Sequence, residues 1–119
     1  MAKILLVDDA AFMRMMLKTT LTQAGYTDLI EAEDGAKAVE IYTAERPDLV
    51  FMDITMPNKD GLETLKEIKA LDPNATIVMC SAMGQETMVM DSIKSGAKDF
   101  IVKPFKPERI LSTVKKILG

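Results

Sequence analysis

Five short apolar runs alternate with five amphipathic stretches along the chain, and this alternation limits the possible folds more than any other feature of the sequence. The runs read KILLV, DLIEA, DLVFM, TIVMC and DFIVK, and we expect a β-strand at each, over residues 3–7, 28–32, 48–52, 76–80 and 99–103. Four runs are almost continuously apolar, which is typical of strands that helices cover on both faces. The run DLIEA is more polar and favours an edge strand.

The stretches between these runs have the apolar spacing of helices that bury one face. From Ile110 onward, and again from Leu62, apolar residues recur at steps of three and four, which places them on one stripe of a helix. Asp72 and Pro73 are expected to end the helix that contains Leu62. Gly25 follows the first helix at the place where a C-terminal cap belongs.

Strands that alternate with helices predict a parallel sheet with right-handed crossovers. Five strands in 119 residues fit one α/β domain over residues 1–119, with the flavodoxin-like (βα)5 fold and helices on both faces of the sheet. Its strand order is 2-1-3-4-5, so strands 1 and 3 are neighbours and the order reverses between them. Ligands of such sheets bind beyond the carboxyl ends of the strands at that reversal.

The composition excludes several classes of protein. The chain has no histidine, which excludes a Cys–His nucleophile pair, a histidine metal site and a phosphohistidine. Its one cysteine, Cys80, lies in an apolar run and is expected to be a small buried hydrophobe. A net charge of −3 disfavours nucleic acid as a partner. The first apolar run is only four residues long, too short for a signal peptide or a membrane span, so we expect a cytoplasmic protein.

Three acidic side chains converge on the predicted ligand edge of the sheet. Asp8 and Asp9 follow strand 1, and Asp53 follows strand 3. At about 4 Å and an effective dielectric constant near 20, each pair of these carboxylates repels by roughly 4 kcal/mol. Protons or a cation must relieve this repulsion. A hard divalent cation with oxygen ligands suits the site, and Mg²⁺ is the expected ion.

Two further polar residues are predicted at the same edge. Ser81 follows strand 4 and Lys103 follows strand 5. A cation and an ammonium group can neutralise a transferring phosphoryl group, a hydroxyl can bond one of its oxygens, and the carboxylate of Asp53 can act as nucleophile. Taken singly, each acid is more often a turn or helix cap, Lys103 a surface lysine and Ser81 a cap of the fourth helix. The convergence of all five favours a phosphoryl-transfer site.

The motifs that carry these residues closely resemble the receiver domains of response regulators. They are LLVDD, FMDITMP with Pro57, the nearby Gly61, CSA, and DFIVKPF with Pro104, and the resemblance runs from Lys3 to Leu118. The segments DDAAFMRMML and CSAMGQ are similar to the chemotaxis regulators of the CheY type that have phenylalanine at the switch position. The resemblance implies that residues 1–119 form a single receiver domain of a two-component system.

The resemblance also implies roles for the site residues. Asp53 is phosphorylated by a chemotaxis-type histidine kinase. Asp9 and Asp53 coordinate Mg²⁺ together with the backbone carbonyl of Thr55, and Asp8 acts mainly through water. Lys103 pairs with the phosphoryl group. The chain is then a phospho-acceptor signalling protein that assists its own phosphoryl transfer and dephosphorylation, and not an enzyme in the usual sense.

A conformational switch is implied by the same resemblance. Ser81 moves to bond the phosphoryl group, and Phe100 then turns inward and reshapes the face made by the fourth helix, the fifth strand and the fifth helix. The peptide bond between Lys103 and Pro104 is expected to be cis. Met83 has an apolar side chain that cannot orient an attacking water, so we expect slow spontaneous loss of phosphate.

The fourth predicted helix offers a surface for a partner. Met88, Val89 and Met90 are consecutive, and at about 100° per residue at least one of them must be exposed. Flexible methionines suit a groove for a partner helix. We hypothesise that this face binds a peptide segment of the flagellar motor switch. The residues assigned to the switch and partner face are Met83, Val89, Lys94, Lys98 and Phe100. A dedicated phosphatase is a further possible partner, and a monomer is expected.

Three alternative functions remain open from the sequence. The first is a phosphorelay carrier that passes phosphate between histidine proteins. The second is a receiver from a longer transcription factor. The third is a phosphohydrolase of the haloacid dehalogenase type, which needs a second aspartate two residues after the nucleophile, where this chain has Thr55. No nucleotide-binding glycine motif occurs, so a phosphoryl donor must come from outside the chain.

Overall fold

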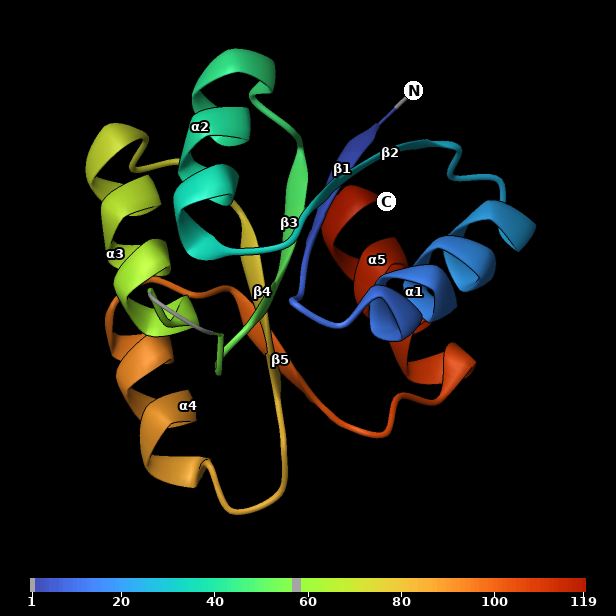
Figure 1. Ribbon diagram of the computed structural model, residues 1–119. Coiled ribbons are helices and arrows are strands. Elements are labelled where there is room, and N and C mark those ends of the chain that lie inside the picture. Colours follow the sequence, from blue (N-terminus) through green and yellow to red (C-terminus); the bar gives the residue numbers. More distant parts are fainter. Residues whose placement is uncertain (1, 57–58) are drawn as a thin grey trace.

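Five parallel strands form one sheet in the computed structural model, which describes residues 2–56 and 59–119. The strand order is β2-β1-β3-β4-β5, and each strand is followed by a helix (Figure 1). The strands are β1 (Lys3–Val7), β2 (Asp28–Ala32), β3 (Leu49–Asp53), β4 (Ile77–Ser81) and β5 (Asp99–Val102). The helices are α1 (Ala11–Gln23), α2 (Gly35–Glu45), α3 (Gly61–Leu71), α4 (Glu86–Lys94) and α5 (Pro107–Leu118). The predicted flavodoxin-like order is confirmed.

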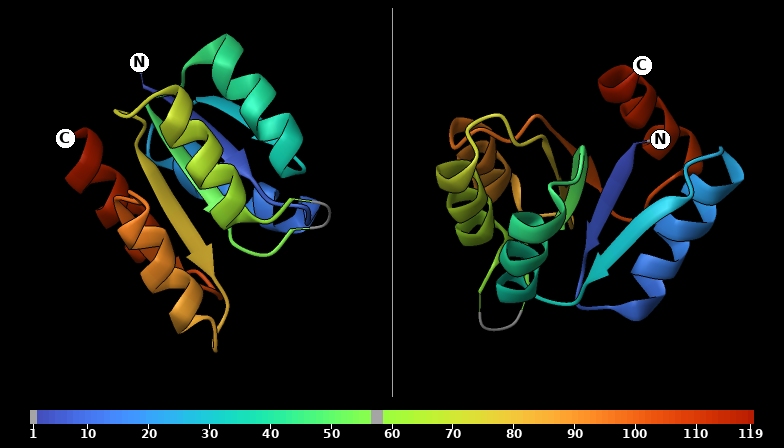
Figure 2. Two further views of the ribbon diagram at one scale, coloured as in Figure 1. Left: turned by 90° about the vertical axis from the view of Figure 1, so that its left-hand side faces the viewer. Right: turned by 90° about the horizontal axis from the view of Figure 1, so that it is seen from above.

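The helices cover the sheet in two layers. Helices α1 and α5 lie on one face, and α2, α3 and α4 lie on the other (Figure 2). Successive side chains of a strand point to opposite faces. In β1, Ile4 and Leu6 therefore pack into the core under α1 and α5, while Leu5 and Val7 pack into the core under α2, α3 and α4. A strand buried in this way must be apolar at every position, which explains the continuous runs.

The helix ends agree with the sequence signals. Helix α1 is followed by Gly25, whose φ of 96° lies in the left-handed region that glycine adopts without strain. The N-cap of α3 is Asp60, whose side chain accepts a hydrogen bond from the backbone N–H of Glu63, and the helix ends before Asp72. No helix in the described ranges is long and apolar enough to cross a membrane.

Strand β5 differs from the expectation for a strand covered on both faces. Its burial alternates, so that Ile101 is buried while Phe100 and Val102 are exposed. The reason is its position at the edge of the sheet, beside β4 alone. Phe100 and Val102 line an open groove together with residues of α4, because that helix does not close over them. The expectation for β2 is confirmed, since β2 is the other edge strand.

Candidate functional site

The carboxyl ends of four strands meet at one edge of the sheet and hold the predicted site residues there. Asp53 is the last residue of β3 and Ser81 is the last residue of β4. The sequence had placed both residues directly after their strands. Asp8 follows β1, and Lys103 follows β5. The parallel register pairs Asp53 with Cys80, the neighbour of Ser81, so the two strand ends are level with each other.

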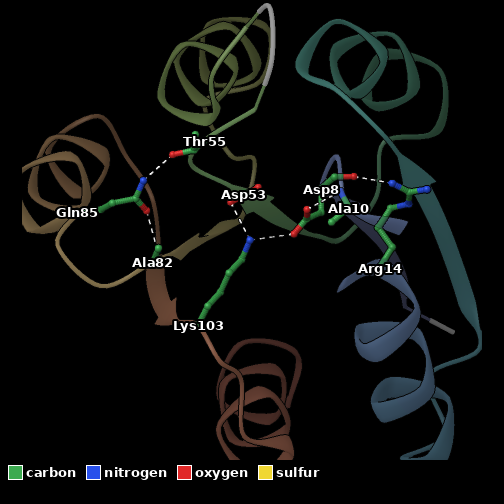
Figure 3. A network of polar contacts seen from close by, with 8 residues as sticks. All are labelled: Asp8, Ala10, Arg14, Asp53, Thr55, Ala82, Gln85 and Lys103. Atoms are coloured by element: carbon green, nitrogen blue, oxygen red, sulfur yellow. Dashed lines mark hydrogen bonds and ion pairs between the residues drawn. The ribbon is translucent and has the colours of Figure 1, made fainter. Parts of the chain in front are cut away.

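Lys103 joins two buried carboxylates at this edge. Its Nζ donates to Oδ2 of Asp8 and to Oδ1 of Asp53, each at 3.1 Å (Figure 3). The side chains of Asp8 and Asp53 are only 2 % and 8 % exposed, and that of Lys103 is 22 % exposed. Burial by itself lowers the pKa of Lys103, but the two carboxylates outweigh burial and raise it, so the ammonium stays charged.

Asp53 has the most perturbed carboxyl group of the site. Burial raises its pKa first, and repulsion from Asp8 adds to the rise, while attraction to Lys103 limits it. The result is a pKa of about 6 instead of 3.8. Near neutral pH the group is therefore mostly ionised, as a nucleophile must be. The positive charge of Lys103 does not fully offset the effects of burial and of Asp8 on this pKa. A cation at this site would lower the pKa of Asp53 further.

The acidic residues offer ligands for such a cation. Asp8, Asp9 and Asp53 each place one carboxylate oxygen so that the three atoms lie within 4.8 Å of one another. Asp8 and Asp53 are buried, and Asp9 is exposed to solvent. Three converging carboxylates with one side open to water fit a hard divalent cation that keeps several waters, as Mg²⁺ does.

Asp8 does not act as a helix cap. Helix α1 begins after Ala10, and within the described chain its N-terminus carries no side-chain capping hydrogen bond. The Oδ1 atom of Asp8 instead accepts the backbone N–H of Ala10 at 2.9 Å, and the backbone carbonyl of Asp8 accepts Nη1 of Arg14 at 2.6 Å (Figure 3). These contacts hold the carboxylate in the site, facing Lys103. The helix-cap alternative is wrong for Asp8, and the turn alternative holds, because its side chain accepts from the backbone N–H two residues later.

Ser81 is buried at the end of β4 and is not the cap of α4 either, because that helix begins after Gln85. Cys80 beside it is fully buried, and burial raises the pKa of its thiol, so it behaves as the small hydrophobe that the sequence indicated. The peptide bond between Lys103 and Pro104 is cis, as the resemblance implied. Pro57 lies outside the described residues.

Sequence reasoning missed one contact beside the site. The side chain of Gln85 accepts the backbone N–H of Ala82 at 2.7 Å and donates to Oγ1 of Thr55 at 2.5 Å (Figure 3). Thr55 itself is exposed, two residues beyond Asp53. The expected role of its backbone carbonyl as a metal ligand stays a prediction. No periodicity in the sequence signals a side chain that bridges two loops.

Most residues of the predicted partner face line a groove next to the site. Its volume is about 480 Å³, and Met83, Val89, Lys94 and Phe100 are among the residues that line it. Met83 and Phe100 are exposed, and Val89 is buried at the base of the groove. Lys98 is exposed but is not among the described lining residues, because α4 ends at Lys94 and the chain then turns toward β5. Of the three consecutive residues of α4, Met90 is the exposed one.

Comparison with known proteins gives a consistent result. Residues 4–115 match the family described as response regulator receiver domain. The chain is 60 % identical over 117 residues to the chemotaxis protein CheY of Bacillus subtilis, covering 98 % of both chains. It is 56 % identical over 115 residues to CheY of Thermotoga maritima, covering 97 % of this chain and 96 % of that one. The structure of a CheX–CheY–BeF3–Mg²⁺ complex from Borrelia burgdorferi superposes with a TM-score of 0.93 at 38 % identity, covering 99 % of this chain and 90 % of that one.

Proposed function

Because this chain belongs to the response regulator receiver domain family, we propose that Asp53 is the residue that takes up the phosphoryl group. The chain is a CheY-like response regulator of chemotaxis, phosphorylated in two-component signalling, and it does not belong to a classical enzyme family. The single observation that carries the assignment of Asp53 is its contact with Lys103. A buried carboxylate at a strand end, held by a half-buried ammonium that also holds Asp8, has the arrangement that phosphoryl transfer needs.

The proposed reaction starts from a phosphohistidine of a chemotaxis-type kinase. An oxygen of Asp53 attacks the phosphorus atom, the P–N bond breaks, and its electron pair returns to the imidazole, which takes up a proton from water. The product is an acyl phosphate on Asp53. Lys103 already lies 3.1 Å from the attacking carboxylate and can turn its ammonium to the new phosphoryl oxygens. The hydroxyl of Ser81, at the neighbouring strand end, would donate to another of them.

The acidic cluster would hold Mg²⁺ during this reaction. Asp9, Asp53 and the backbone carbonyl of Thr55 are the proposed ligands, and Asp8 would act through water because its two oxygens already accept from Ala10 and Lys103. The ion would neutralise charge on the transferring phosphoryl group. The same groups would assist hydrolysis of the acyl phosphate, which is expected to be slow because Met83, beside the site, cannot orient a water.

The output is proposed to be binding of the flagellar motor switch. The groove between α4 and β5 exposes apolar side chains of Met83, Met90 and Phe100, with the cation of Lys94 at its margin. This combination fits the apolar face of an amphipathic helix that also carries an acidic residue. Phe100 is 36 % exposed in the present state. An inward turn of Phe100 after phosphorylation would reshape the floor of the groove and couple the site to the partner.

Phosphotransfer from a kinase tests the first part of the proposal. A chemotaxis-type histidine kinase labelled with [γ-³²P]ATP should pass its label to the wild-type chain and not to Asp53→Asn. Label retained on Asp53→Asn would show that another residue accepts the group. A dedicated phosphatase partner should remove the label faster than it is lost from the chain alone.

Peptide binding tests the second part. A labelled motor-switch peptide should bind more tightly to the chain with Mg²⁺ and BeF3⁻ than without, and Lys94→Glu should weaken this binding by about tenfold through a reversed charge at the groove. Lys66→Glu is the matched control, because this lysine is exposed on α3 and lies outside the lining residues and outside the predicted partner face. Equal loss in both variants would mean that net charge, and not the groove, governs binding.

A further inference from the structure

Gln85 connects the loop after β3 with the loop after β4, both on the side of Asp53 that faces away from Asp8 (Figure 3). Its carboxamide oxygen accepts the backbone N–H of Ala82 in the loop after β4, and its amide group donates to the hydroxyl of Thr55 in the loop after β3 (Figure 3). The backbone bond from N–H of Ile54 to the carbonyl of Cys80, at 3.1 Å, lies at the ends of the two strands. Beyond that bond, Gln85 continues the connection between the loops through a side chain.

The position of Gln85 in its helix is consistent with a role outside the helix. It is the residue directly before α4, where serine, threonine, aspartate or asparagine usually caps the first turn. In the part of the chain that the structure describes, Gln85 makes no such capping bond to α4. Its side chain reaches back to Ala82 and across to Thr55 instead. The helix therefore begins without a side-chain cap, and the carboxamide of Gln85 forms hydrogen bonds with the two loops.

Phosphorylation of Asp53 would change the position of the loop after β4. The acyl phosphate adds three acceptor oxygens at the strand ends, and the proposed function requires Ser81 to move toward them. Ala82 shares a peptide bond with Ser81, so a shift of the Ser81 backbone toward the phosphoryl group also moves the N–H of Ala82. That N–H is held by Gln85, which is itself held by Thr55. The resting position of the loop after β4 is thus stabilised by two hydrogen bonds that the movement of Ser81 would disturb.

We propose that Gln85 is a positioning residue that latches the loop after β4 to Thr55 in the unphosphorylated state and releases it when Asp53 is phosphorylated. The inference rests on the proposed phosphorylation of Asp53 and adds a residue that sets how strongly the resting state is favoured. A group that stabilises the resting state weakens the binding of every ligand of the other state, by the factor by which it favours the resting state. The amide of Ala82, once released, becomes available as a donor to the phosphoryl oxygens.

Binding of BeF3⁻ in the presence of Mg²⁺, followed by isothermal titration calorimetry, measures the effect directly. Loss of two partly exposed hydrogen bonds from the resting state should tighten BeF3⁻ binding to Gln85→Ala by about fivefold. Thr55→Val keeps the backbone carbonyl but lacks the hydroxyl, and it should tighten binding in the same direction. The double variant should bind no more tightly than Gln85→Ala. Gln23→Ala, at the exposed end of α1, is the matched control and should bind like the wild type.

Amide hydrogen exchange gives a second readout, which reports directly on the hydrogen bond from Ala82 to Gln85. Without BeF3⁻, the amide of Ala82 should exchange faster in Gln85→Ala than in the wild type, while amides of the central strands stay protected. If the wild type binds BeF3⁻ and Gln85→Ala binds it equally or more weakly, the latch is wrong and the proposed function stands. If the wild type does not bind BeF3⁻ with Mg²⁺, the proposed function fails and the latch fails with it.

Discussion

Replacing Lys103 by methionine should destabilise the fold because it leaves two buried carboxylates facing each other. The Nζ atom lies 3.1 Å from each carboxylate, and at an effective dielectric constant near 20 each contact is worth roughly 5 kcal/mol before desolvation is subtracted. Loss of one partner of a buried ion pair typically costs about 3–5 kcal/mol. Since Lys103 is 22 % exposed, we expect the lower end, about 3 kcal/mol.

Urea denaturation is the assay for this prediction. With a slope of about 1–3 kcal/mol per molar urea, a loss of this size lowers the midpoint by about 1–3 M. Lys66→Met is the matched control, because Lys66 is exposed on α3, and its free energy of unfolding should change by no more than about 0.5 kcal/mol. The second substitution Asp53→Asn should restore most of the stability of Lys103→Met, because it removes one of the two facing charges.

The pH dependence of the deficit follows from the sign of the pKa shift of Asp53. Its folded pKa of about 6 lies above the ordinary 3.8, so the folded state holds more protons in this window and stability falls as the pH rises through it. Without the ammonium of Lys103 the repulsion is larger. The deficit should therefore be greatest above pH 6 and should shrink toward pH 4. A deficit equal to that of Lys66→Met, or one that Asp53→Asn does not change, would mean that Lys103 does not relieve repulsion between the two carboxylates.

Three further predictions concern the surroundings of the site. Gly61→Ala should lower the free energy of unfolding by at least about 1–3 kcal/mol, because a Cβ there would lie 2.1 Å from the carbonyl oxygen of Asp53. Gly25→Ala has no atom within 4 Å of the new Cβ but has a positive φ, and it should lower the free energy of unfolding by only about 1–2 kcal/mol. Met83→Glu should lose phosphate faster than the wild type, because a carboxylate can orient the attacking water; the decay of the acyl phosphate after removal of the donor measures this rate. Mg²⁺ at about 100 times its dissociation constant should stabilise the wild type by roughly 2.7 kcal/mol, and Asp9→Asn should reduce this gain in thermal denaturation.

Each of these predictions has a clear contrary result. If Gly61→Ala were as stable as the wild type, the close approach of α3 to the end of β3 would be wrong. Equal decay rates for the wild type and Met83→Glu would remove Met83 from the path of the water. An undiminished effect of Mg²⁺ on Asp9→Asn would place the ion away from the acidic cluster.

The alternation of strands and helices and the convergence of the acidic site could be predicted because both follow from the apolar runs of the sequence, and the strand order followed from the fold that five such strands fit. Buried parallel strands require apolar residues at every position, and their carboxyl ends meet at one edge. Asp8, Asp53 and Lys103 each end such a run, so their meeting follows from the fold. The pairing of Lys103 with both acids adds a geometry that only the structure gives.

The features that could not be predicted depend on where elements stop and how far side chains reach. Phe100 is exposed because α4 does not extend over the edge strand, and nothing in the run DFIVK reports that. Lys94 lies in the groove and Lys98 does not, because the helix ends between them. Gln85 bridges two loops through its side chain. A contact of this kind leaves no repeating pattern in the sequence from which it could be predicted.

Phosphoryl uptake from acetyl phosphate shows whether Asp53 is the phospho-acceptor. Intact-protein mass spectrometry would follow the wild type and Asp53→Asn with and without Mg²⁺. We expect a single added phosphoryl group on the wild type, dependent on Mg²⁺ and lost in Asp53→Asn. If the wild type takes up no phosphoryl group with Mg²⁺ present, or Asp53→Asn takes it up as readily, Asp53 is not the phospho-acceptor.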